Sequence, residues 1–495
     1  MARFNQPPVG TATVNLAQGQ AYTQSPELEF VSILLTSFAS DAFYRSANDT
    51  MTRLKQLASQ LPTEFVAKAL IFARHEYGMR SITHVMASEI GKRISGTTFG
   101  TAFYDKIIKR VDDITEIISY HMSKKEKISN AMRKGLGKAL GRQDAYSLAK
   151  YRAGNKEVKL VDVVNLIHPK KTEKAVEAII ALTKNDLKSS GTTWEAVLSA
   201  AGTEGASDED KVEAKAAAWS TLVNEGKLAQ FALLRNLRNI IETAPEVLPK
   251  ALEQLVNPER IKKSLIFPFR YYSAYKEIEK LNSGPQVRMT MVALSKAIDI
   301  SCSTLPEFTG TTCILIDVSA SMSSASAKLS EKSTQKVSDI AAVFGAVMTK
   351  AFNADVIQFH GEAKYLNFNP LDSTMTIATG MRFNGGSTSF PAAIRCMNKK
   401  YDRIIILSDM QGWDDNLINY GNTGGNPKEA FRAYKQLTGA NPKVYSFDLA
   451  GYGTLQFPER NVYCLAGFSD KTLSIMSYLE KDKDALINQV RAISL

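Results

Sequence analysis

Several residue types that mark common classes of protein are scarce in this chain. Its 495 residues include only four cysteines, Cys302, Cys313, Cys396 and Cys464, and their spacing fits no metal-binding motif. No apolar run approaches the roughly 18 residues that a transmembrane helix needs. The first residues lack the apolar core of a signal peptide, so we expect a protein of the reducing cytoplasm.

Signatures of catalysis are also missing. The sequence has no glycine loop of the GK[ST] type, and its five histidines form no triad pattern near the carboxylates described below. A metal-dependent nuclease would need a general base beside its metal, and none is evident. We therefore expect a protein that is not an enzyme.

The remaining composition is that of a globular protein with more than one domain. Hydrophobic residues make up 44% of the chain and charged residues 22%. Because single cores rarely grow beyond about 250–300 residues, at least two domains are expected. The patterns predict an N-terminal arm over 1–25, an all-α HEAT-like solenoid over 26–304 and an α/β domain over 305–495. A compact helical bundle is the alternative for the middle part.

The middle part carries apolar residues at helical spacing, and Pro, Gly, Asn or Thr separates one stretch from the next. Repeated helices of similar length without a strict sequence period favour an irregular stack of antiparallel helix pairs. Within it, the pattern predicts one helix over Phe103–Tyr120. The stretch Ser189–Ala218, with its glycines and acidic cluster, looks the least ordered.

The C-terminal part alternates between strand-like and helix-like stretches. This alternation favours a doubly wound sheet of parallel strands with helices on both faces. The predicted strands are Cys313–Val318, Asp355–Phe359, Arg403–Ser408, Lys443–Asp448 and Val462–Leu465.

Hard oxygen donors occur where three segments meet the expected edge of this sheet. Ligands of open α/β sheets bind outside the carboxyl ends of the strands, and carboxylate and hydroxyl oxygens suit Mg²⁺. The sequence therefore predicts a divalent-cation site with Mg²⁺ as the cofactor; a polar turn with an N-cap serine is the alternative. The candidate ligands are Asp317, Ser319, Ser321, Ser387, Thr388 and Asp409, with the choice between Ser387 and Thr388 left open.

The pattern D-x-S-x-S at Asp317–Ser321 resembles the metal-ion-dependent adhesion site (MIDAS) of von Willebrand factor A domains. The resemblance implies an A-like fold for residues 305–495. Two positions depart from the family pattern. Ser387 stands where Thr commonly follows Gly-Gly, and Met410 follows Asp409 where Gly is frequent. Neither change removes an oxygen ligand.

The net charge of +11 is concentrated in one section. Residues 306–495 hold 19 of the 61 Lys and Arg and 18 of the 50 Asp and Glu, which leaves 42 basic and 32 acidic residues for the rest. Residues 123–174 alone carry 14 basic and 5 acidic residues, a net charge of +9. Such a concentration of positive charge indicates a polyanionic partner, and nucleic acid is the favoured one.

This basic section contains the candidate RNA-binding residues. Lys and Arg neutralise phosphates, while Tyr and His stack on or hydrogen-bond to exposed bases. A solvated helix face is the alternative for the charges, and a structural role in the turn before Pro169 is the alternative for His168. The candidates are Arg133, Lys134, Lys138, Arg142, Lys150, Tyr151, Arg152, Lys156, His168, Lys170 and Lys171.

A helical solenoid with one basic patch, joined to an A-like domain, resembles the Ro autoantigen family of TROVE-domain, Y RNA-binding proteins. The resemblance runs from about Pro26 to the end and is most specific at Ala229–Ile241, Arg260–Tyr275, Lys150–Pro169 and the D-x-S-x-S motif. It implies that the helices form a ring, that Y RNA lies on a basic outer surface, and that single-stranded ends of misfolded RNA enter the hole. It also assigns RNA-binding roles to Lys150, Arg152 and His168.

We therefore expect an RNA-binding protein, monomeric within a ribonucleoprotein, that binds small noncoding Y-like RNA in RNA quality control or processing. Family analogy suggests an exoribonuclease as a protein partner; no membrane or DNA partner is expected. The alternative is a Mg²⁺-dependent protein-interaction scaffold, in which the A-like domain grasps a carboxylate of its partner.

Overall fold

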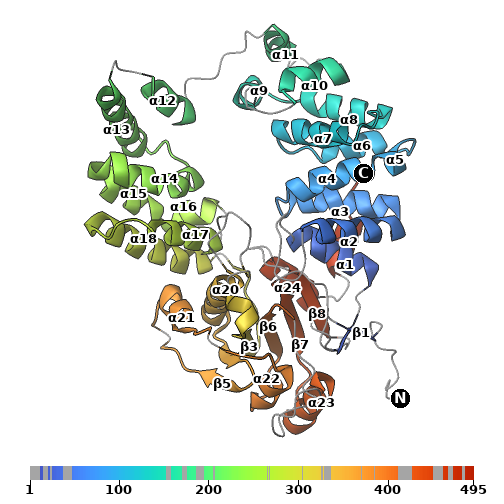
Figure 1. Ribbon diagram of the computed structural model, residues 1–495, viewed down its shortest axis with the longest axis vertical. Coiled ribbons are helices and arrows are strands. Elements are labelled where there is room, and N and C mark those ends of the chain that lie inside the picture. Colours follow the sequence, from blue (N-terminus) through green and yellow to red (C-terminus); the bar gives the residue numbers. More distant parts are fainter. Residues whose placement is uncertain are drawn as a thin grey trace. The chain divides into compact units, whose positions relative to one another are not determined.

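The structure of the protein is a computed structural model (Figure 1). In the part of the chain that it describes, no helix is long and apolar enough to cross a membrane. The described residues are 12–14, 20–22, 25–36, 47–151, 158–169, 176–184, 194–203, 207–264, 266, 268–303, 305–324, 327, 336–369, 371–383, 385–410, 426–449, 461–466, 472–481 and 485–495.

The chain divides into two compact units, and each is described by itself. The N-terminal helical unit comprises residues 24–41, 45–190 and 481–495. The C-terminal unit comprises residues 1–23, 42–44 and 191–480. The domain boundary that we predict at 304/305 lies inside the C-terminal unit and stays a prediction.

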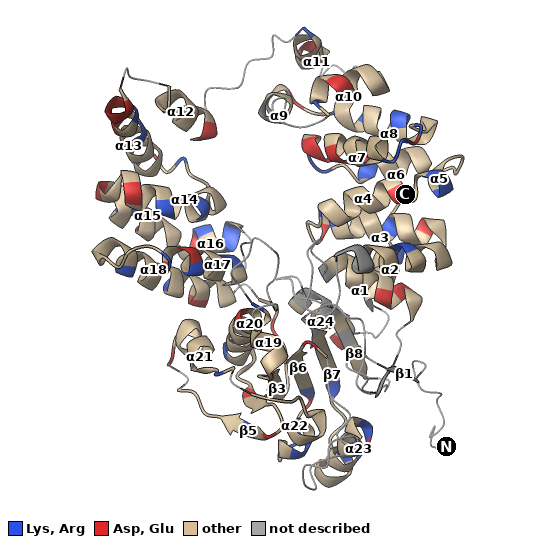
Figure 2. Cartoon of the chain, viewed as in Figure 1, with Lys and Arg blue, Asp and Glu red and all other residues tan. Residues whose placement is uncertain are grey.

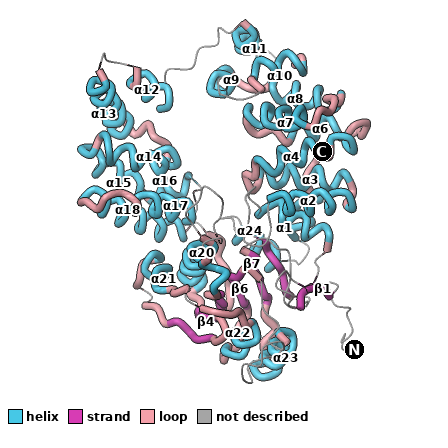
Figure 3. The backbone as a smooth tube through the Cα atoms, in the orientation of Figure 1, coloured by secondary structure: helices cyan, strands magenta, loops and turns pink. Residues whose placement is uncertain are grey.

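The N-terminal helical unit consists of short helices stacked largely in chain order, as the helical spacing predicts (Figure 3). They are α1 (Pro26–Thr36), α2 (Ala47–Gln60), α3 (Thr63–His75), α4 (Ser81–Glu89), α5 (Gly91–Ile94), α6 (Gly100–Lys106), α7 (Val111–Ser123), α8 (Asn130–Gly141), α9 (Ala145–Tyr151), α10 (Leu160–Ile167), α11 (Val176–Thr183) and α25 (Ala485–Arg491).

The single helix predicted over 103–120 is wrong, because a turn separates α6 from α7. The Asp113 carboxylate accepts hydrogen bonds from the backbone N–H groups of Lys109 (3.0 Å) and Arg110 (2.9 Å), which starts α7 anew. Ile107 and Ile108 in the turn are buried. The apolar spacing therefore continues through the turn, so the sequence does not reveal where α6 ends and α7 begins.

A buried ionic network fastens α3 and α4 to α7. The Arg74 guanidinium donates to both oxygens of Asp113 at 2.7–3.0 Å, and His84 lies 3.0 Å from the same carboxylate. Burial alone would raise the pKa of Asp113, but the hydrogen bond from His84 and the Arg74 charge hold that pKa well below its usual range. Removing one partner would leave a buried charge unpaired, which is strongly destabilising.

The last residues of the chain pack on its first helices. Helix α25 contacts α1 and α3, and Arg491 forms an ion pair of 2.8 Å with Glu27. Lys106 donates to the backbone oxygen (3.1 Å) and hydroxyl (3.0 Å) of Ser494. The C-terminal residues of the chain are therefore part of the N-terminal helical unit.

The C-terminal unit begins with an antiparallel pair in the predicted N-terminal arm, β1 (Ala12–Val14) with β2 (Gln20–Tyr22). A second series of helices follows after residue 193. It comprises α12 (Trp194–Ala201), α13 (Asp208–Asn224), α14 (Gln230–Thr243), the 3₁₀ helix η1 (Pro245–Val247), α15 (Leu248–Leu255), α16 (Pro258–Ser264), α17 (Pro268–Ile278) and α18 (Pro285–Cys302).

The stretch expected to be least ordered is helical over most of its described residues, because it contains α12 and the start of α13. Ser207 begins α13 with a capping box: its hydroxyl accepts from the Asp210 N–H (3.1 Å), and the Asp210 carboxylate accepts from the Ser207 N–H (3.0 Å). The acidic cluster thus marks a helix start, where negative charge is favourable.

A six-stranded sheet forms the rest of the C-terminal unit. Its order is β5-β4-β3-β6-β7-β8, and β5 alone is antiparallel to its neighbour. The strands are β3 (Thr312–Asp317), β4 (Asp355–Phe359), β5 (Ala363–Leu366), β6 (Arg403–Ser408), β7 (Lys443–Asp448) and β8 (Val462–Ala466). The five predicted strands are present, and β5 is an additional short edge strand.

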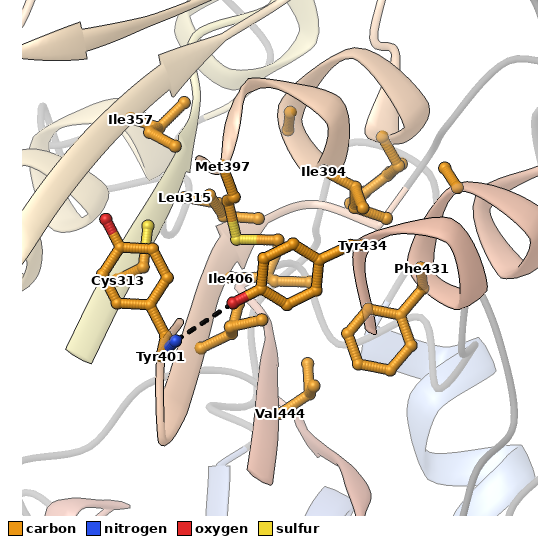
Figure 4. Close-up of a cluster of buried hydrophobic side chains, with 14 of the residues drawn as sticks. Cys313, Leu315, Ile357, Ile394, Met397, Tyr401, Ile406, Phe431, Tyr434 and Val444 are labelled. Atoms are coloured by element: carbon orange, nitrogen blue, oxygen red, sulfur yellow. Dashed lines mark hydrogen bonds between the residues drawn. The ribbon is translucent and has the colours of Figure 1, made fainter. Parts of the chain in front are cut away.

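Helices cover both faces of this sheet. They are α19 (Ala320–Ser323), α20 (Val337–Phe352), α21 (Thr374–Gly380), α22 (Phe390–Cys396), α23 (Pro427–Thr438) and α24 (Thr472–Lys481). On one face, α22 and α23 pack on the strands through a cluster that includes Leu315, Ile406 and Phe431 (Figure 4). On the other face, α20 comes so close that a Cβ on Gly345 would lie 2.6 Å from Cδ1 of Ile316.

Polar contacts join the second series of helices to the sheet domain within this unit. The Tyr272 hydroxyl donates to Asp339 of α20 (3.2 Å). Asp299 of α18 accepts from Lys350 (3.1 Å) and from the Thr374 hydroxyl (2.6 Å). These contacts explain why the helices after residue 193 and the sheet form one compact unit.

Two substitutions on α23 test the packing in Figure 4. Phe431 is 2% exposed in the apolar cluster, whereas Leu437 on the same helix is 83% exposed. We expect Phe431→Ala to lower the free energy of unfolding of the C-terminal unit by roughly 3–5 kcal/mol, because it leaves a cavity. Leu437→Ala is the control and should change it by less than about 0.5 kcal/mol. Urea denaturation measures both, and equal effects would contradict the packing.

Candidate metal centre and nucleic-acid interface

The first predicted metal-ligand loop starts where the strand order of the sheet reverses, between β3 and β6. Asp317 is the last residue of β3, and the parallel register places it beside the end of β6. The Ser408 hydroxyl donates to one Asp317 oxygen (2.6 Å), and the Ser319 N–H donates to the other (2.9 Å). The Asp317 carboxylate is thereby held in one orientation.

The glycine loop lies against this first loop. The Gly385 N–H donates to the Val318 oxygen (3.0 Å), and the Ala320 N–H donates to the Gly386 oxygen (3.2 Å). A Cβ on Gly385 would lie 2.6 Å from Cβ of His360. Only glycine fits at this position, which explains Gly385, the first glycine of the pair that precedes the candidate hydroxyl ligands.

The third loop turns sharply after Asp409. Met410 has a φ of 60°, a left-handed conformation that explains why glycine is frequent at this position. The Met410 N–H donates to the Ser408 hydroxyl (2.9 Å), and its buried side chain joins the apolar cluster of Figure 4. Burial of the methionine side chain offsets the backbone strain, so this turn forms with a residue other than glycine.

The structure brings the three predicted loops together at one edge of the sheet. Asp317, Ser319, Thr388 and Asp409 are buried, and Ser321 is half-buried with its hydroxyl 3.1 Å from that of Ser319. Ser387 is exposed, and its hydroxyl lies beside Gly361. The choice between Ser387 and Thr388 as ligand stays a prediction.

The electrostatics of this edge favour a cation. Burial, and then the negative charge of Asp409, raise the pKa of Asp317 to about 7, against the hydrogen bonds from Ser408 and Ser319. Two carboxylates close together in a buried site repel each other, and a divalent cation would remove that repulsion. Among the described residues no group of three or more His, Cys, Asp or Glu could hold a metal, so hydroxyl oxygens would have to complete the ligand set. The donors present fit Mg²⁺ in this way.

Ser408 is a residue of this site that the sequence motifs do not single out. Its hydroxyl orients Asp317 and accepts from the Met410 N–H, so it links the first and third loops. Its position as the last residue of a predicted strand, directly before Asp409, is the signal that could have identified it.

Helix α8 carries several of the predicted nucleic-acid residues that the structure describes, and Figure 2 shows basic residues on this helix. Ser129 caps α8 by accepting from the Met132 N–H (3.2 Å). Arg133, Lys134 and Lys138 are exposed on this helix. A Cβ on Gly137 would lie 3.4 Å from Cα of Pro169, so the turn after α10 packs closely on α8.

His168 occupies this turn in an unusual backbone conformation. Its φ is 47°, in the left-handed region, and its N–H donates to the Val164 oxygen (3.0 Å) to end α10. The side chain is exposed. Because Pro169 contacts α8, the imidazole is anchored next to the helix that carries Arg133, Lys134 and Lys138.

Four of the predicted residues have partners within the protein. Lys138 forms an ion pair with Asp105 (3.0 Å) but stays exposed, and Arg133 donates to the Asn130 side chain (3.2 Å). The Arg142 guanidinium pairs with the Asp105 carboxylate and donates to the backbone oxygens of Asp105 (2.8 Å) and Ile108 (3.2 Å). The Tyr151 ring faces the Arg110 guanidinium at 4.9 Å. Arg142 thus holds α8 to the end of α6, and one face of Tyr151 is occupied by a cation.

The remaining predicted residues cannot be placed. The side chain of Lys150 and the whole of Arg152, Lys156, Lys170 and Lys171 lie outside the described residues.

Comparisons with known proteins agree with this architecture. A family model described as the TROVE domain matches residues 186–336. The crystal structure of the Deinococcus radiodurans RO (RSR) protein has a TM-score of 0.61 and 15% sequence identity, and the match covers 94% of this chain and 99% of that chain. Residues 186–336 of the chain thus match the TROVE domain, and the chain as a whole has the fold of this Ro protein. The predicted family and fold class, a helical solenoid followed by an A-like domain, are confirmed; ring closure stays a prediction.

A third relative is matched over a short region. Telomerase protein component 1 of Mus musculus is 33% identical over 93 residues, which are 18% of this chain and 3% of that protein. The chain therefore spans only a small part of that relative's length. In this chain, the TROVE match includes α12 to α18 and the D-x-S-x-S motif, but not α8 or His168.

A pH titration tests the coupling of the two carboxylates. The folded pKa of Asp317, about 7, lies above its ordinary 3.8. Between these two pKa values, the folded protein keeps a proton on Asp317 that the unfolded chain has lost. The free energy of unfolding therefore falls as the pH rises from about 4 to 7. With chelator present, Asp409→Asn should reduce this fall, since it removes the like charge. Thermal unfolding across this pH range measures the effect.

The matched control is Asp372→Asn, in the loop before α21. It should leave the pH dependence unchanged. If stability fell as steeply with rising pH in the Asp409→Asn protein as in the wild-type protein, the two carboxylates would not interact.

Proposed function

We propose that this protein binds RNA as a component of a ribonucleoprotein, and that α8 with the turn at His168 forms the binding face. The exposed basic residues of α8 beside an exposed imidazole are the observation that carries the proposal. Its support is the net charge of +9 over 123–174 together with the TROVE family match. The proposed ligand is a small structured noncoding RNA of the Y RNA type, in RNA quality control or processing.

The chemistry of this face suits a structured RNA with exposed bases. Arg133, Lys134 and Lys138 project from one helix, where they can neutralise successive phosphates and release counterions. His168 sits in a turn fixed by Pro169 and can stack on or hydrogen-bond to an unpaired base. A rigid helix with an anchored imidazole combines affinity for the backbone with recognition of bases.

The metal centre supports a second role, the capture of a protein partner. We propose that Asp317, Ser319, Ser321, Asp409 and one of Ser387 and Thr388 hold Mg²⁺. When bound, the ion would offer an open coordination position to a carboxylate of the partner. An exoribonuclease is the partner class that family analogy suggests. Both roles are binding functions, which is consistent with a protein that is not an enzyme.

Binding of copurified RNA tests the first role. RNA that copurifies with the protein from its host is crosslinked to it and sequenced. We expect one or two small structured RNA species, crosslinked to the protein near residues 133–138 and 168. The double variant Lys134→Gln, His168→Ala should weaken binding of that RNA at least roughly tenfold at moderate salt. Lys134→Gln alone should also lower the slope of log affinity against log salt by about 1.

Lys55→Gln on α2 is the matched control, since it removes one exposed lysine from the same unit. It should leave RNA binding within about twofold. If the double variant bound the RNA as tightly as the wild-type protein, the α8 face would not be the binding site. Recovery of only bulk RNA that washes off with salt would favour the protein-scaffold role.

Thermal unfolding with Mg²⁺ tests the second role. Mg²⁺ should raise the unfolding temperature of the wild-type protein, and the effect should grow as the pH rises through about 7, because binding requires the deprotonated Asp317. Asp317→Asn should abolish the response, whereas Asp355→Asn at the start of β4 should retain it. A Mg²⁺ response that survives Asp317→Asn would place the ion elsewhere.

A further inference from the structure

A groove of about 530 Å³ lies between α15 and α18 in the C-terminal unit, and neither the metal centre nor the α8 face contributes to it. The two helices are in contact (Figure 1). Pro249, Leu252 and Val256 of α15 line one wall of the groove, and Met289 and Val292 of α18 line the other. Most of the lining is therefore apolar.

The apolar wall on α18 is open to solvent. Met289 is 47% exposed and Val292 is 57% exposed. A single exposed apolar side chain is ordinary on a protein surface, but neighbouring ones that line the same groove form a patch. A patch of this kind that is bordered by polar groups marks a surface for interaction.

The spacing of the lining residues fits a helical ligand. Pro249, Leu252 and Val256 follow the i, i+3, i+7 spacing of one helix face. On α18, Lys296 follows Met289 at the same interval of seven residues. Seven residues are about two turns of helix, or roughly 10 Å. An amphipathic helix that docks in a groove presents its apolar anchors at i, i+3 or i+4, and i+7, over the same length.

Charged side chains border the apolar lining. Arg288 and Lys296 are the first and last lining residues of α18, whereas Glu253 lies on α15. All three side chains are exposed, and in the described part of the chain none of them forms an ion pair. Two unpaired cations on one wall favour a ligand that carries acidic side chains beside its apolar face.

The chemistry of the groove does not suit a nucleic acid. Its described lining has no aromatic ring on which a base would stack. The Glu253 carboxylate would also repel a phosphate. A protein helix with both apolar and charged side chains matches the two walls better.

We propose that the α15–α18 groove binds a short amphipathic helix of a partner protein, with its apolar anchors in the groove and acidic side chains against Arg288 and Lys296. Such a helix would cover Met289 and Val292. The proposed capture of a partner at the metal centre depends on Mg²⁺, whereas this groove needs no ion. The groove is therefore a separate protein-docking surface, and it can fail or succeed independently of the metal centre and the α8 face.

Fluorescence anisotropy of labelled helical peptides tests the groove in the full chain with chelator present. The acidic probe is an amphipathic helix with leucine at i, i+3 and i+7, flanked by glutamate. The basic probe has lysine in place of each glutamate, and a scrambled peptide has the composition of the acidic probe without its apolar face. We expect the wild-type protein to bind the acidic probe at least about tenfold more tightly than either other peptide.

Variants of exposed residues assign the binding to the groove. Val292→Asp should weaken binding of the acidic probe at least about tenfold, because it places a carboxylate against an apolar anchor. Val212→Asp on α13 is the matched control, since it alters an exposed valine of the same unit, and it should change the affinity by less than about twofold. Arg288→Glu combined with Lys296→Glu should reverse the preference, so that the basic probe binds more tightly than the acidic one.

The same measurements can overturn the proposal. Equal affinity for the three peptides, no binding up to millimolar concentration, or unchanged affinity in Val292→Asp would each do so. Sedimentation velocity tests a second copy of the chain as the occupant. Self-association of the wild-type protein that is lost in Val292→Asp would make the groove an interface between copies and would overturn the partner helix.

The groove and the two proposed functional sites are also distinguishable. Binding of the acidic probe should persist with chelator and in the double variant Lys134→Gln, His168→Ala. Binding that requires Mg²⁺ would assign the glutamates of the probe to the metal centre and would overturn the groove as its site. Loss of binding in the double variant would likewise place the peptide on the α8 face.

Discussion

The parallel pairing of β3 with β6 is the interaction on which the candidate metal centre depends. Because the strand order reverses between these strands, the loops that leave them diverge and leave a crevice at their carboxyl ends. The pairing places Asp317 next to Ser408, whose hydroxyl orients the carboxylate, and brings Asp409 close enough to raise the pKa of Asp317. The glycine loop completes the edge only because Gly385 lets its backbone approach Val318. One strand pairing thus gathers donors that are some 90 residues apart in the chain.

The two units carry different binding chemistry. The N-terminal helical unit is held by the buried Arg74–Asp113 pair and by the docked α25, and it presents basic residues on α8. The C-terminal unit holds the metal-ligand loops. The proposed RNA ligand would use the basic face of α8, whereas a protein partner with a free carboxylate would use the sheet edge. Each of the two proposed binding roles can therefore be tested in its own unit.

The strands of the sheet, and the loops that carry the candidate metal ligands, were largely predictable from the sequence. β4, β6 and β7 have the predicted bounds, because buried parallel strands are short apolar runs whose ends are marked by polar residues. The turn between α6 and α7 was not predictable, since Ile107 and Ile108 continue the apolar period through it. The helices in 194–224 were missed because glycines and acidic residues were read as loop signals, although Ser207 and Asp210 form a capping box. The edge strand β5 is too short and too exposed to show the alternation of apolar and polar residues that identifies a strand in a sequence.

The sequence by itself determined the class of the protein: a helical solenoid with a concentrated positive charge, an α/β domain, and the order of the oxygen donors along the chain. These features are local, because hydrophobic period and residue type act over a few neighbouring positions. Tertiary structure decided which side chains are available for binding. It buried Thr388 and exposed Ser387, and it engaged Arg142 with Asp105. Such outcomes depend on packing between segments far apart in the chain, and no local pattern encodes which of them will meet.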